Sequence, residues 1–361
     1  MQIPFITGFP GFISRQLMKE LIHQHKVEKM YAIVLPSQVA LANQVAKELV
    51  NESPQVSIIL VEGDITSPDL GLSQDSIERI RQDVTIVWHL AAIYDLAVPK
   101  LAAWTVNVHG TQMVNDFIKT IPNLKRYMYF STAYVAGTRE GILKEDELIR
   151  PTAFKNFYEE TKFEAELLVE QIKTVVPTTI IRPGIVRGHS KTGETSKFDG
   201  PYFFVNMIDR LSSLPVIPFV GRSQSFINVV PIDFIIKSVI YCSENERAAG
   251  KTLHLTDPNP HPVEEVYRQM VLSLTGKYPK GRLPLIIAKT GLHSKWLRKK
   301  LGVEKETLDY LTWNAHFDTT IASEVLEDSS IVCADFIDSL PPMLAFYQQH
   351  KRDAHYHVPI K

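Results

Sequence analysis

The feature that most restricts the fold is an alternation of continuous apolar runs with amphipathic stretches in the first half of the chain. The runs are IPFIT (3–7), MYAIVL (30–35), VSIILVEGD (56–64), VTIVWHLAA (84–92), RYMYFSTA (126–133) and TTIIRPGIV (178–186). Between them lie helical patterns such as FISRQLMKELIHQH and QVALANQVAKELVNE. Strands that are apolar throughout are buried on both faces, which is typical of a parallel sheet covered by helices. The pattern therefore predicts an α/β protein with a doubly wound parallel sheet.

The alternation weakens after about residue 188, where HSKTGETSKFDGPYFF is polar and predicts a loop. Further on, INVVPIDFIIKSVIYC (227–242) and KTLHLTD (251–257) have the pattern of another helix and strand that rejoin the sheet. We expect a dinucleotide-binding Rossmann domain over residues 1–188, joined by parts of 227–257. The remainder of 189–361 is expected to form a smaller, mostly helical substrate-binding domain.

Composition and net charge limit the kinds of ligand, partner and location that we expect. The 361 residues carry a net charge of −1, so no overall field attracts the chain to nucleic acid, and we expect no such partner. Cys242 and Cys333 lie far apart, and the terminal histidines His350, His355 and His357 have no cysteine or acidic ligand set beside them, so we expect no metal site. The sequence shows no leader and no run of about 20 apolar residues, so the expected location is the cytoplasm.

A glycine-rich turn follows the first apolar run, in PFITGFPGFIS. Gly8 and Gly11 stand where a strand gives way to a helix, and Ser14 stands where a dinucleotide-binding turn of this spacing has its last glycine. Such glycines let backbone approach a pyrophosphate, whose oxygens bind the free N–H groups of the helix N-terminus. A plain tight turn is the alternative, but the strand before it and the helix after it favour a nucleotide site.

Two later strand ends bear on the adenosine half of such a nucleotide. Asp64 is placed to accept a hydrogen bond from an adenine amino group, or else to begin an Asx turn or cap a helix, and residue type alone does not decide. The small residues of HLAA (89–92) allow a cofactor to approach closely. The second run ends in VLPSQ. Ser37 and Gln38 stand where NAD-binding proteins typically have an acidic residue and NADP-binding proteins an arginine, so neither signal is present. The expected cofactor is therefore NAD(P), with NADH and NADPH undecided.

The candidate catalytic groups are a tyrosine and a lysine in FYEETK. Tyr158 and Lys162 are four residues apart, which places them on one face of a helix. A nearby ammonium lowers the pKa of a phenol from its ordinary value of about 10. The phenol can then pass a proton to a carbonyl oxygen as hydride reaches the carbonyl carbon. A hydroxyl of Ser131 or Thr132, at the end of YFST, can hydrogen-bond the same oxygen.

The same spacing recurs in AFYQQHK, where Tyr347 and Lys351 lie in a charged tail with nothing around them that supports chemistry. Spacing alone is therefore weak support for a catalytic role. Tyr158 differs in its context, because it follows the Ser-Thr strand end after the length of a loop and precedes the strand TTIIRPG.

Seven motifs occur in an order that resembles the extended short-chain dehydrogenase/reductase family over the first half to two-thirds of the chain: TGFPGFIS, GDIT, HLAA, NVHGT, YFSTAYVAG, YEETK and IIRPGIVRG. The resemblance implies that Tyr158 is the proton donor, that Lys162 activates it, and that Thr132 takes the family's catalytic Ser/Thr place. It also implies an NAD(P) cofactor. Asn107 of NVHGT is, on the same basis, a structural tie and not a catalytic group.

The resemblance further implies which residues bind the cofactor. The pyrophosphate is expected to contact Gly8, Gly11, Phe12 and Ile13, and the adenine Asp64 and Ile65. The neighbouring ribose is expected to contact Ala91 and Ala92, and the nicotinamide Pro183, Gly184 and Ile185. The expected cofactor site is completed by Thr7, Pro10, Leu90, Tyr158 and Lys162.

Within the family, TGFPGFISR, YDLAVP, RPGIVRGHSKTGET and FDTTIASEVL resemble the male-sterility branch, which contains fatty acyl reductases and thioester reductase domains. This implies hydride transfer between nicotinamide and a carbonyl, alcohol or acyl thioester. The small-molecule substrate is expected to be apolar, of fatty acyl type, and bound to coenzyme A or to an acyl carrier protein. Such relatives usually use NADPH, but VLPSQ lacks their arginine. A sugar-nucleotide epimerase or dehydratase and a non-catalytic NAD(P)-sensing protein are the alternatives on the same fold.

A basic stretch, KYPKGRLPLIIAKTGLHSKWLRKK, runs over 277–300 without an acidic residue. Three hypotheses compete for it: a solvated basic face over ordinary core, a peripheral contact with anionic lipid, and a docking site for an acidic carrier protein or the phosphates of coenzyme A. The helical patterns TQMVNDFIKTI and FKNFYEETKFEAELLVEQI likewise suit either a homodimer interface or ordinary covering of the sheet.

Overall fold

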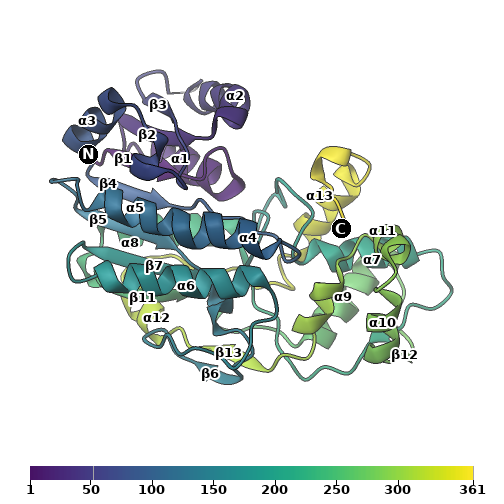
Figure 1. Ribbon diagram of the computed structural model, residues 1–361. Coiled ribbons are helices and arrows are strands. Elements are labelled where there is room, and N and C mark those ends of the chain that lie inside the picture. Colours follow the sequence, from purple (N-terminus) through teal and green to yellow (C-terminus); the bar gives the residue numbers. More distant parts are fainter. Residues whose placement is uncertain (52, 361) are drawn as a thin grey trace.

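The computed structural model describes residues 1–51 and 53–360. Within these residues, seven parallel strands form one sheet in the order β11-β7-β5-β4-β1-β2-β3 (Figure 1). The strands are β1 (Pro4–Thr7), β2 (Lys29–Val34), β3 (Ser57–Glu62), β4 (Ile86–His89), β5 (Arg126–Phe130), β7 (Thr178–Pro183) and β11 (Thr252–Leu255). The predicted α/β fold with a doubly wound parallel sheet is confirmed.

Helices cover both faces of the sheet. One face carries α1 (Phe12–His23), α2 (Val39–Val50) and α8 (Ile232–Glu244); the other carries α3 (Gln74–Asp83), α5 (Gly110–Ile118) and α6 (Phe157–Ile172). Successive strand residues point into opposite cores: Ile6 and Trp88 join the first, whereas Phe5 and Val87 join the second. This alternation explains why the strands are apolar at most positions, because neither face is left to solvent.

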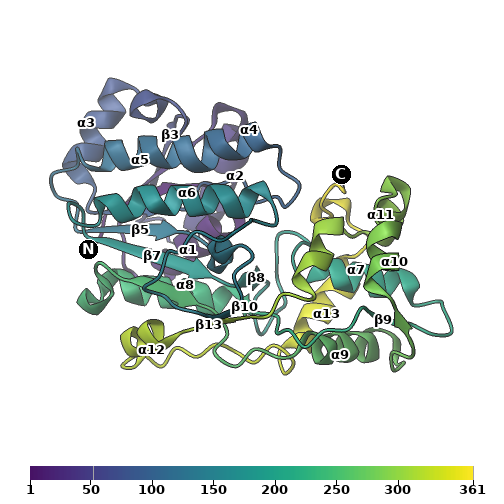
Figure 2. The same cartoon turned by 60° about the horizontal axis from the view of Figure 1, so that its bottom comes forward.

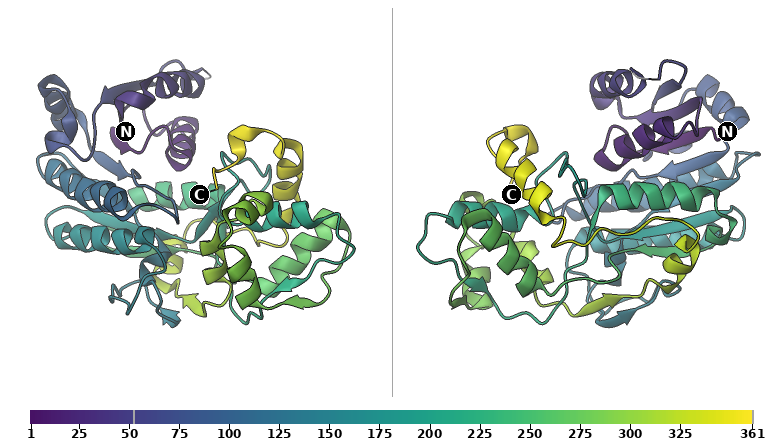
Figure 3. Two further views of the ribbon diagram at one scale, coloured as in Figure 1. Left: turned by 45° about the vertical axis from the view of Figure 1, so that its right-hand side comes forward. Right: turned by 180° about the vertical axis from the view of Figure 1, so that it is seen from behind.

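A second body of helices, here called the helical lobe (residues 198–220, 263–311 and 336–360), packs around its own buried cluster beside the sheet (Figures 2 and 3). Its helices are α7 (Tyr202–Leu211), α9 (Val263–Thr275), α10 (Leu285–Gly291), α11 (Lys295–Leu301) and α13 (Leu340–His350). The chain alternates between the two bodies, because α8, β11 and α12 (Thr320–Leu326) return to the sheet. The lobe is thus assembled from separated segments.

Short elements complete the description. They are β6 (Gly141–Leu143), β8 (Ile185–Arg187), β9 (Phe219–Val220), β10 (Val229–Pro231), β12 (Arg282–Leu283), β13 (Ala315–Phe317) and α4 (Lys100–Ala103). They form parallel pairs, β6 with β13, β8 with β10, and β9 with β12. The first of these pairs joins the segment after β5 to the segment that leaves the helical lobe.

The basic stretch divides into β12, α10 and α11. Lys289 is 2.7 Å from Asp309, and Leu292 is buried. Ile286 and Trp296 point outward, with exposed fractions of 79% and 68%, so the stretch combines cations with uncovered apolar side chains. The three hypotheses for it stay predictions, as does a homodimer through α5 and α6, which lie side by side (Figure 2). Of the helices in the described residues, none has both the length and the apolar character to cross a bilayer.

Candidate active site

A cavity of about 910 Å³ lies between the carboxyl ends of the strands and the helical lobe. The carboxyl ends of parallel strands are where ligands bind in doubly wound sheets. Every residue that the sequence placed at the cofactor or catalytic site lines this cavity, with the exception of Thr7. The fold thus gathers residues from five strand ends and from α6 in one place.

The glycine turn forms one wall of the cavity as bare backbone. Gly8 has a φ of +83°, and a Cβ added to it would lie 2.8 Å from the backbone nitrogen of Ala91. A Cβ on Gly11 would lie 2.7 Å from the carbonyl oxygen of Gly8. Gly11 also precedes α1 without a side-chain cap, which leaves the first-turn N–H groups for a ligand. This cradle fits the pyrophosphate of a dinucleotide.

Ser14 replaces the last glycine of the pattern and holds the turn together. Its buried hydroxyl lies 3.0 Å from the carbonyl oxygen of Gly8 and 2.9 Å from that of Gly11. The hydroxyl can donate to only one of them at a time. A glycine would allow the same close packing but would not tie the turn to the helix.

Thr7 is fully buried and is not among the residues that line the cavity, so its contact with the cofactor stays a prediction. Its hydroxyl accepts the backbone N–H groups of Leu90, at 3.1 Å, and Ala91, at 3.0 Å. The same oxygen is 2.7 Å from Nδ1 of His89, whose pKa burial lowers to about 3. Thr7 therefore orients the loop after β4, whose small residues form part of the cofactor wall.

The structure shows Asp64 in an Asx turn, and its contact with an adenine amino group stays a prediction. Its Oδ1 accepts the backbone N–H and the hydroxyl of Thr66, each at 2.8 Å, which makes an Asx turn. The residue nevertheless lines the cavity together with Ile65. The turn leaves the second carboxylate oxygen for a ligand.

Arg15 also lines the cavity, with Gln38 of the segment that follows β2. Its guanidinium lies 3.7 Å from the carboxylate of Glu48, and its side chain is 38% exposed. The sequence interpretation missed this cation because it sought an arginine only at the end of the second strand. The available signal was its position one helical turn after Gly11.

The catalytic trio is assembled at the junction of β5 and α6. Tyr158, in the first turn of α6, and Thr132, which follows β5, both line the cavity, and the Thr132 side chain lies near enough to the phenol to affect its pKa. Lys162 lies one turn further along α6, and its ammonium donates to the hydroxyl of Tyr129, at 2.9 Å, and to the carbonyl of Phe130, at 2.7 Å. Both Tyr158 and Lys162 are buried apart from the cavity that they line.

The pKa values of the two groups differ from expectation. Burial raises the pKa of Tyr158 above the ordinary value of 10, and the Thr132 side chain only partly offsets this. Burial also lowers the pKa of Lys162 to about 7. The predicted depression of the phenol pKa by a full ammonium is therefore wrong for the protein without ligand. The phenol is instead held protonated, which is the form that donates a proton.

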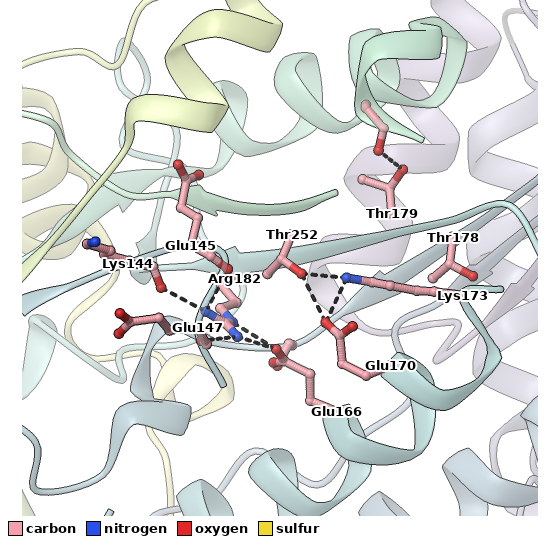
Figure 4. Close-up of polar contacts among 12 residues, drawn as sticks. Lys144, Glu145, Glu147, Glu166, Glu170, Lys173, Thr178, Thr179, Arg182 and Thr252 are labelled. Carbon is pink, nitrogen blue, oxygen red and sulfur yellow. Dashed lines mark hydrogen bonds and ion pairs between the residues drawn. The ribbon is translucent and has the colours of Figure 1, made fainter. Parts of the chain in front are cut away.

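Of the two hydroxyls after β5, only that of Thr132 is directed to Tyr158. Ser131 donates to Glu166, a fully buried carboxylate on α6. Arg182 of β7 donates to the same carboxylate from two nitrogens, at 2.6 Å and 2.8 Å (Figure 4). A buried charge pair of this kind is costly to separate. It therefore clamps the end of β5 to α6.

Asn107, on the helix after α4, ties three elements together. Its side chain accepts the N–H of Ile93 at 2.8 Å and donates to the hydroxyl of Thr161 at 3.0 Å. Thr161 directly precedes Lys162, so the tie fixes the loop after β4 against the catalytic helix.

The far wall of the cavity comes from residues that sequence reasoning did not select. The largest are Phe203 and Phe204 of α7, Ile227, and Tyr310 of the helical lobe. Tyr94, in the motif YDLAVP, places its ring edge-on to Tyr158, with 5.1 Å between ring centroids. No local pattern marks the lobe residues, because tertiary packing alone brings them to the trio.

The second tyrosine–lysine pair is structural. Tyr347 is buried against Phe198, with 5.0 Å between ring centroids, and Lys351 is 2.7 Å from Asp209. Both anchor α13 in the helical lobe. Of the terminal histidines, His355 lines the cavity.

Comparisons with known proteins agree with this geometry. Residues 6–239, more than half of the chain, match the family model described as male sterility protein. The fatty acyl-CoA reductase wat of Drosophila melanogaster is 28% identical over 272 residues, which cover 65% of this chain and 53% of that protein. The chain therefore spans about half the length of this relative, and smaller shares of others.

Solved structures share the fold. The terminal R domain from the myxalamid PKS-NRPS biosynthetic pathway aligns with a TM-score of 0.83 and 23% identity, over 97% of this chain and 91% of that chain. The UDP-glucuronic acid 4-epimerase from Bacillus cereus, in complex with NAD, aligns with a TM-score of 0.66 and 19% identity, over 97% of this chain and 99% of that chain. From the family match, the sheet and the glycine cradle, the chain belongs to the male sterility protein family of extended short-chain dehydrogenases/reductases.

Proposed function

We propose that the chain reduces the carbonyl of an apolar acyl substrate, either an acyl thioester or an aldehyde, with Tyr158 as the proton donor. The observation that carries the proposal is the position of the Tyr158–Thr132 pair. It lies in the one cavity that has the glycine cradle on one wall and the phenylalanines of α7 on another.

The residues of the chain supply the proton and hold the reactant. When bound, NAD(P)H supplies the hydride that reaches the carbonyl carbon. Tyr158 gives its hydroxyl proton to the carbonyl oxygen, while the hydroxyl of Thr132 hydrogen-bonds that oxygen and orients it. With a thioester, the resulting hemithioacetal loses a thiol and leaves an aldehyde. Lys162, when protonated, stabilises the phenolate that remains.

The apolar acyl group is favoured by the far wall of the cavity. Phe203, Phe204 and Ile227 offer hydrophobic surfaces in the lining of the cavity. The name of the fly relative, a fatty acyl-CoA reductase, supports an acyl thioester of coenzyme A, and a carrier-bound thioester presents the same reacting group. Arg15, one of the cations that line the cavity, lies on the glycine-turn side and would accompany the 2′-phosphate of NADPH.

The test follows the oxidation of NADPH and of NADH with dodecanoyl-CoA and dodecanal. We expect wild-type turnover with net loss of the reduced cofactor, whereas an epimerase returns its cofactor unchanged. Tyr158→Phe should lower kcat roughly 10²-fold to 10⁴-fold, the usual contribution of a general acid, with the cofactor Kd unchanged.

Tyr347→Phe is the matched control, because it removes the hydroxyl of a buried tyrosine with the same spacing to a lysine, outside the cavity. It should keep wild-type kcat. Full turnover by folded Tyr158→Phe would refute the proton-donor role. Cofactor binding without turnover on any carbonyl would instead support a nucleotide sensor.

A further inference from the structure

The first turn of α6 is tied to the helical lobe through a buried carboxylate next to Tyr158. Glu159 has no exposed surface, and its Oε1 accepts the hydroxyl of Tyr310 at 2.7 Å. Its Oε2 accepts the backbone N–H of Lys155 at 3.0 Å. The ammonium of Lys155 lies 3.8 Å from Oε1. Tyr310 is therefore the closest partner that this oxygen has in the described part of the chain.

The tie closes a ring of hydrogen bonds at the start of the catalytic helix. Asn156 caps α6 by accepting the backbone N–H of Glu159 at 2.9 Å. The amide of Asn156 also donates to the hydroxyl of Tyr310 at 3.0 Å. Tyr310 thus accepts from the capping residue and donates to the carboxylate of the same helical turn. Tyr158 lies between these two residues in sequence, so the residues on both sides of it are tied to Tyr310.

Tyr310 belongs to a short helical segment, Lys305–Tyr310, of the helical lobe, and its ring meets the strand-end loop as well. The ring stands edge-on to Tyr134, two residues after Thr132, with 5.3 Å between centroids. It also lines the catalytic cavity. One side chain of the lobe therefore contacts both segments that carry the proton-donor pair.

We propose that Tyr310 is a positioning residue, which sets the place of Tyr158 through Glu159 and makes proton transfer depend on the docked helical lobe. The inference rests on the proposed role of Tyr158. Loss of the Tyr310 hydroxyl leaves one oxygen of a buried carboxylate without its closest donor, which is costly unless the first turn of α6 shifts. A shift of this kind moves the Tyr158 hydroxyl away from its productive position.

The test is the variant Tyr310→Phe, which keeps the ring against Tyr134. With dodecanal and NADPH, we expect kcat to fall roughly 10-fold to 100-fold, while KM and the NADPH Kd stay within about twofold. Adding Glu159→Gln to this variant replaces the carboxylate that has lost its closest donor with a neutral amide, so it should restore most of kcat. The control Tyr267→Phe, which deletes a hydroxyl bonded to Pro218 at 2.9 Å in the same lobe, should keep wild-type kcat.

Three results would overturn the proposal. Unchanged kcat in Tyr310→Phe, with Tyr158→Phe inactive, removes the positioning role and leaves the proposed function intact. A loss that Glu159→Gln does not restore assigns Tyr310 to the substrate itself. If Tyr310→Phe fails to fold, the double variant is compared with Glu159→Gln alone, and a further fall of kcat in the double variant argues against action through Glu159. If the wild-type protein reduced none of the carbonyls, the proposed function would be refuted, but the hydrogen bonds between Tyr310 and Glu159 would not.

Discussion

The two walls of the cavity are built in different ways. The sheet wall consists of backbone and small residues at strand ends, such as Gly8, Gly11 and Ala91, whereas the lobe wall consists of large side chains, such as Phe203 and Tyr310, from separate segments. Backbone is suited to binding the cofactor, which is always the same, because it offers fixed N–H groups and no side-chain volume. Side chains suit a substrate, because they can be replaced without disturbing the fold. The difference predicts that cofactor and substrate recognition can be damaged independently.

The largest effect is expected from Gly8→Ala, which breaks the sheet wall. The added Cβ meets the backbone of Ala91 at 2.8 Å and of Leu90 at 2.9 Å, and backbone there cannot yield. We expect the cofactor Kd, measured by fluorescence titration, to rise at least ~100-fold, with a stability loss of about 1–3 kcal/mol for the strained φ.

Gly250→Ala is the control for strain alone. It has a similar φ of +72°, but nothing lies within 4 Å of the added Cβ. It should lower the melting temperature slightly and leave the cofactor Kd unchanged. Equal cofactor affinity in wild type and Gly8→Ala would contradict a pyrophosphate cradle at this turn.

A smaller effect is expected from the charge of Lys162, which lines the cavity together with Tyr158. Its pKa of about 7 means that the ammonium is lost as pH rises through neutrality. If the charged form supports proton donation, kcat/KM for reduction should fall above about pH 7, by up to about 10-fold per pH unit. A profile that is flat across neutral pH would contradict this assignment.

The stability of the protein reports the same pKa independently. Lys162 is depressed from 10.5 to about 7 in the folded state, so the unfolded chain binds more protons between these values. The free energy of unfolding should therefore rise with pH over this range through Lys162. The melting temperature should rise with pH for the same reason. In Lys162→Met, the part of that rise that comes from Lys162 should disappear.

The smallest effect is expected from Phe203→Ala, which trims the lobe wall. It should raise KM for dodecanal roughly 5-fold to 10-fold, as lost apolar contact implies, and leave KM for butanal and the cofactor Kd unchanged. Phe336→Ala is the control, since Phe336 is buried in the same lobe core away from the cavity. An equal change of KM in both variants would mean general loosening of the lobe.

Local patterns predicted the sheet side of this protein well. The runs of apolar residues predicted the strands, because a strand buried on both faces is apolar at most of its positions. PFITGFPGFIS gave the turn, because only glycine fits where backbone passes backbone. Thr7 was predicted at the cofactor site, yet its hydroxyl accepts from Leu90 and Ala91, because a residue beside the turn gives no sign of which way its hydroxyl points. Arg15 was missed for the same reason, since its direction depends on the helix after the turn.

The sequence by itself determined the parallel sheet, the glycine cradle and the Tyr158–Lys162 pair, because each depends on residues near one another in the chain. Tertiary structure decided which hydroxyl meets Tyr158, that burial keeps the phenol protonated, and that Tyr310 reaches Glu159 from the other body of the molecule. The physical reason is that burial and hydrogen-bond partners are set by segments that are distant along the chain, 151 residues apart for Glu159 and Tyr310. The spacing of residues along the chain therefore does not predict those contacts.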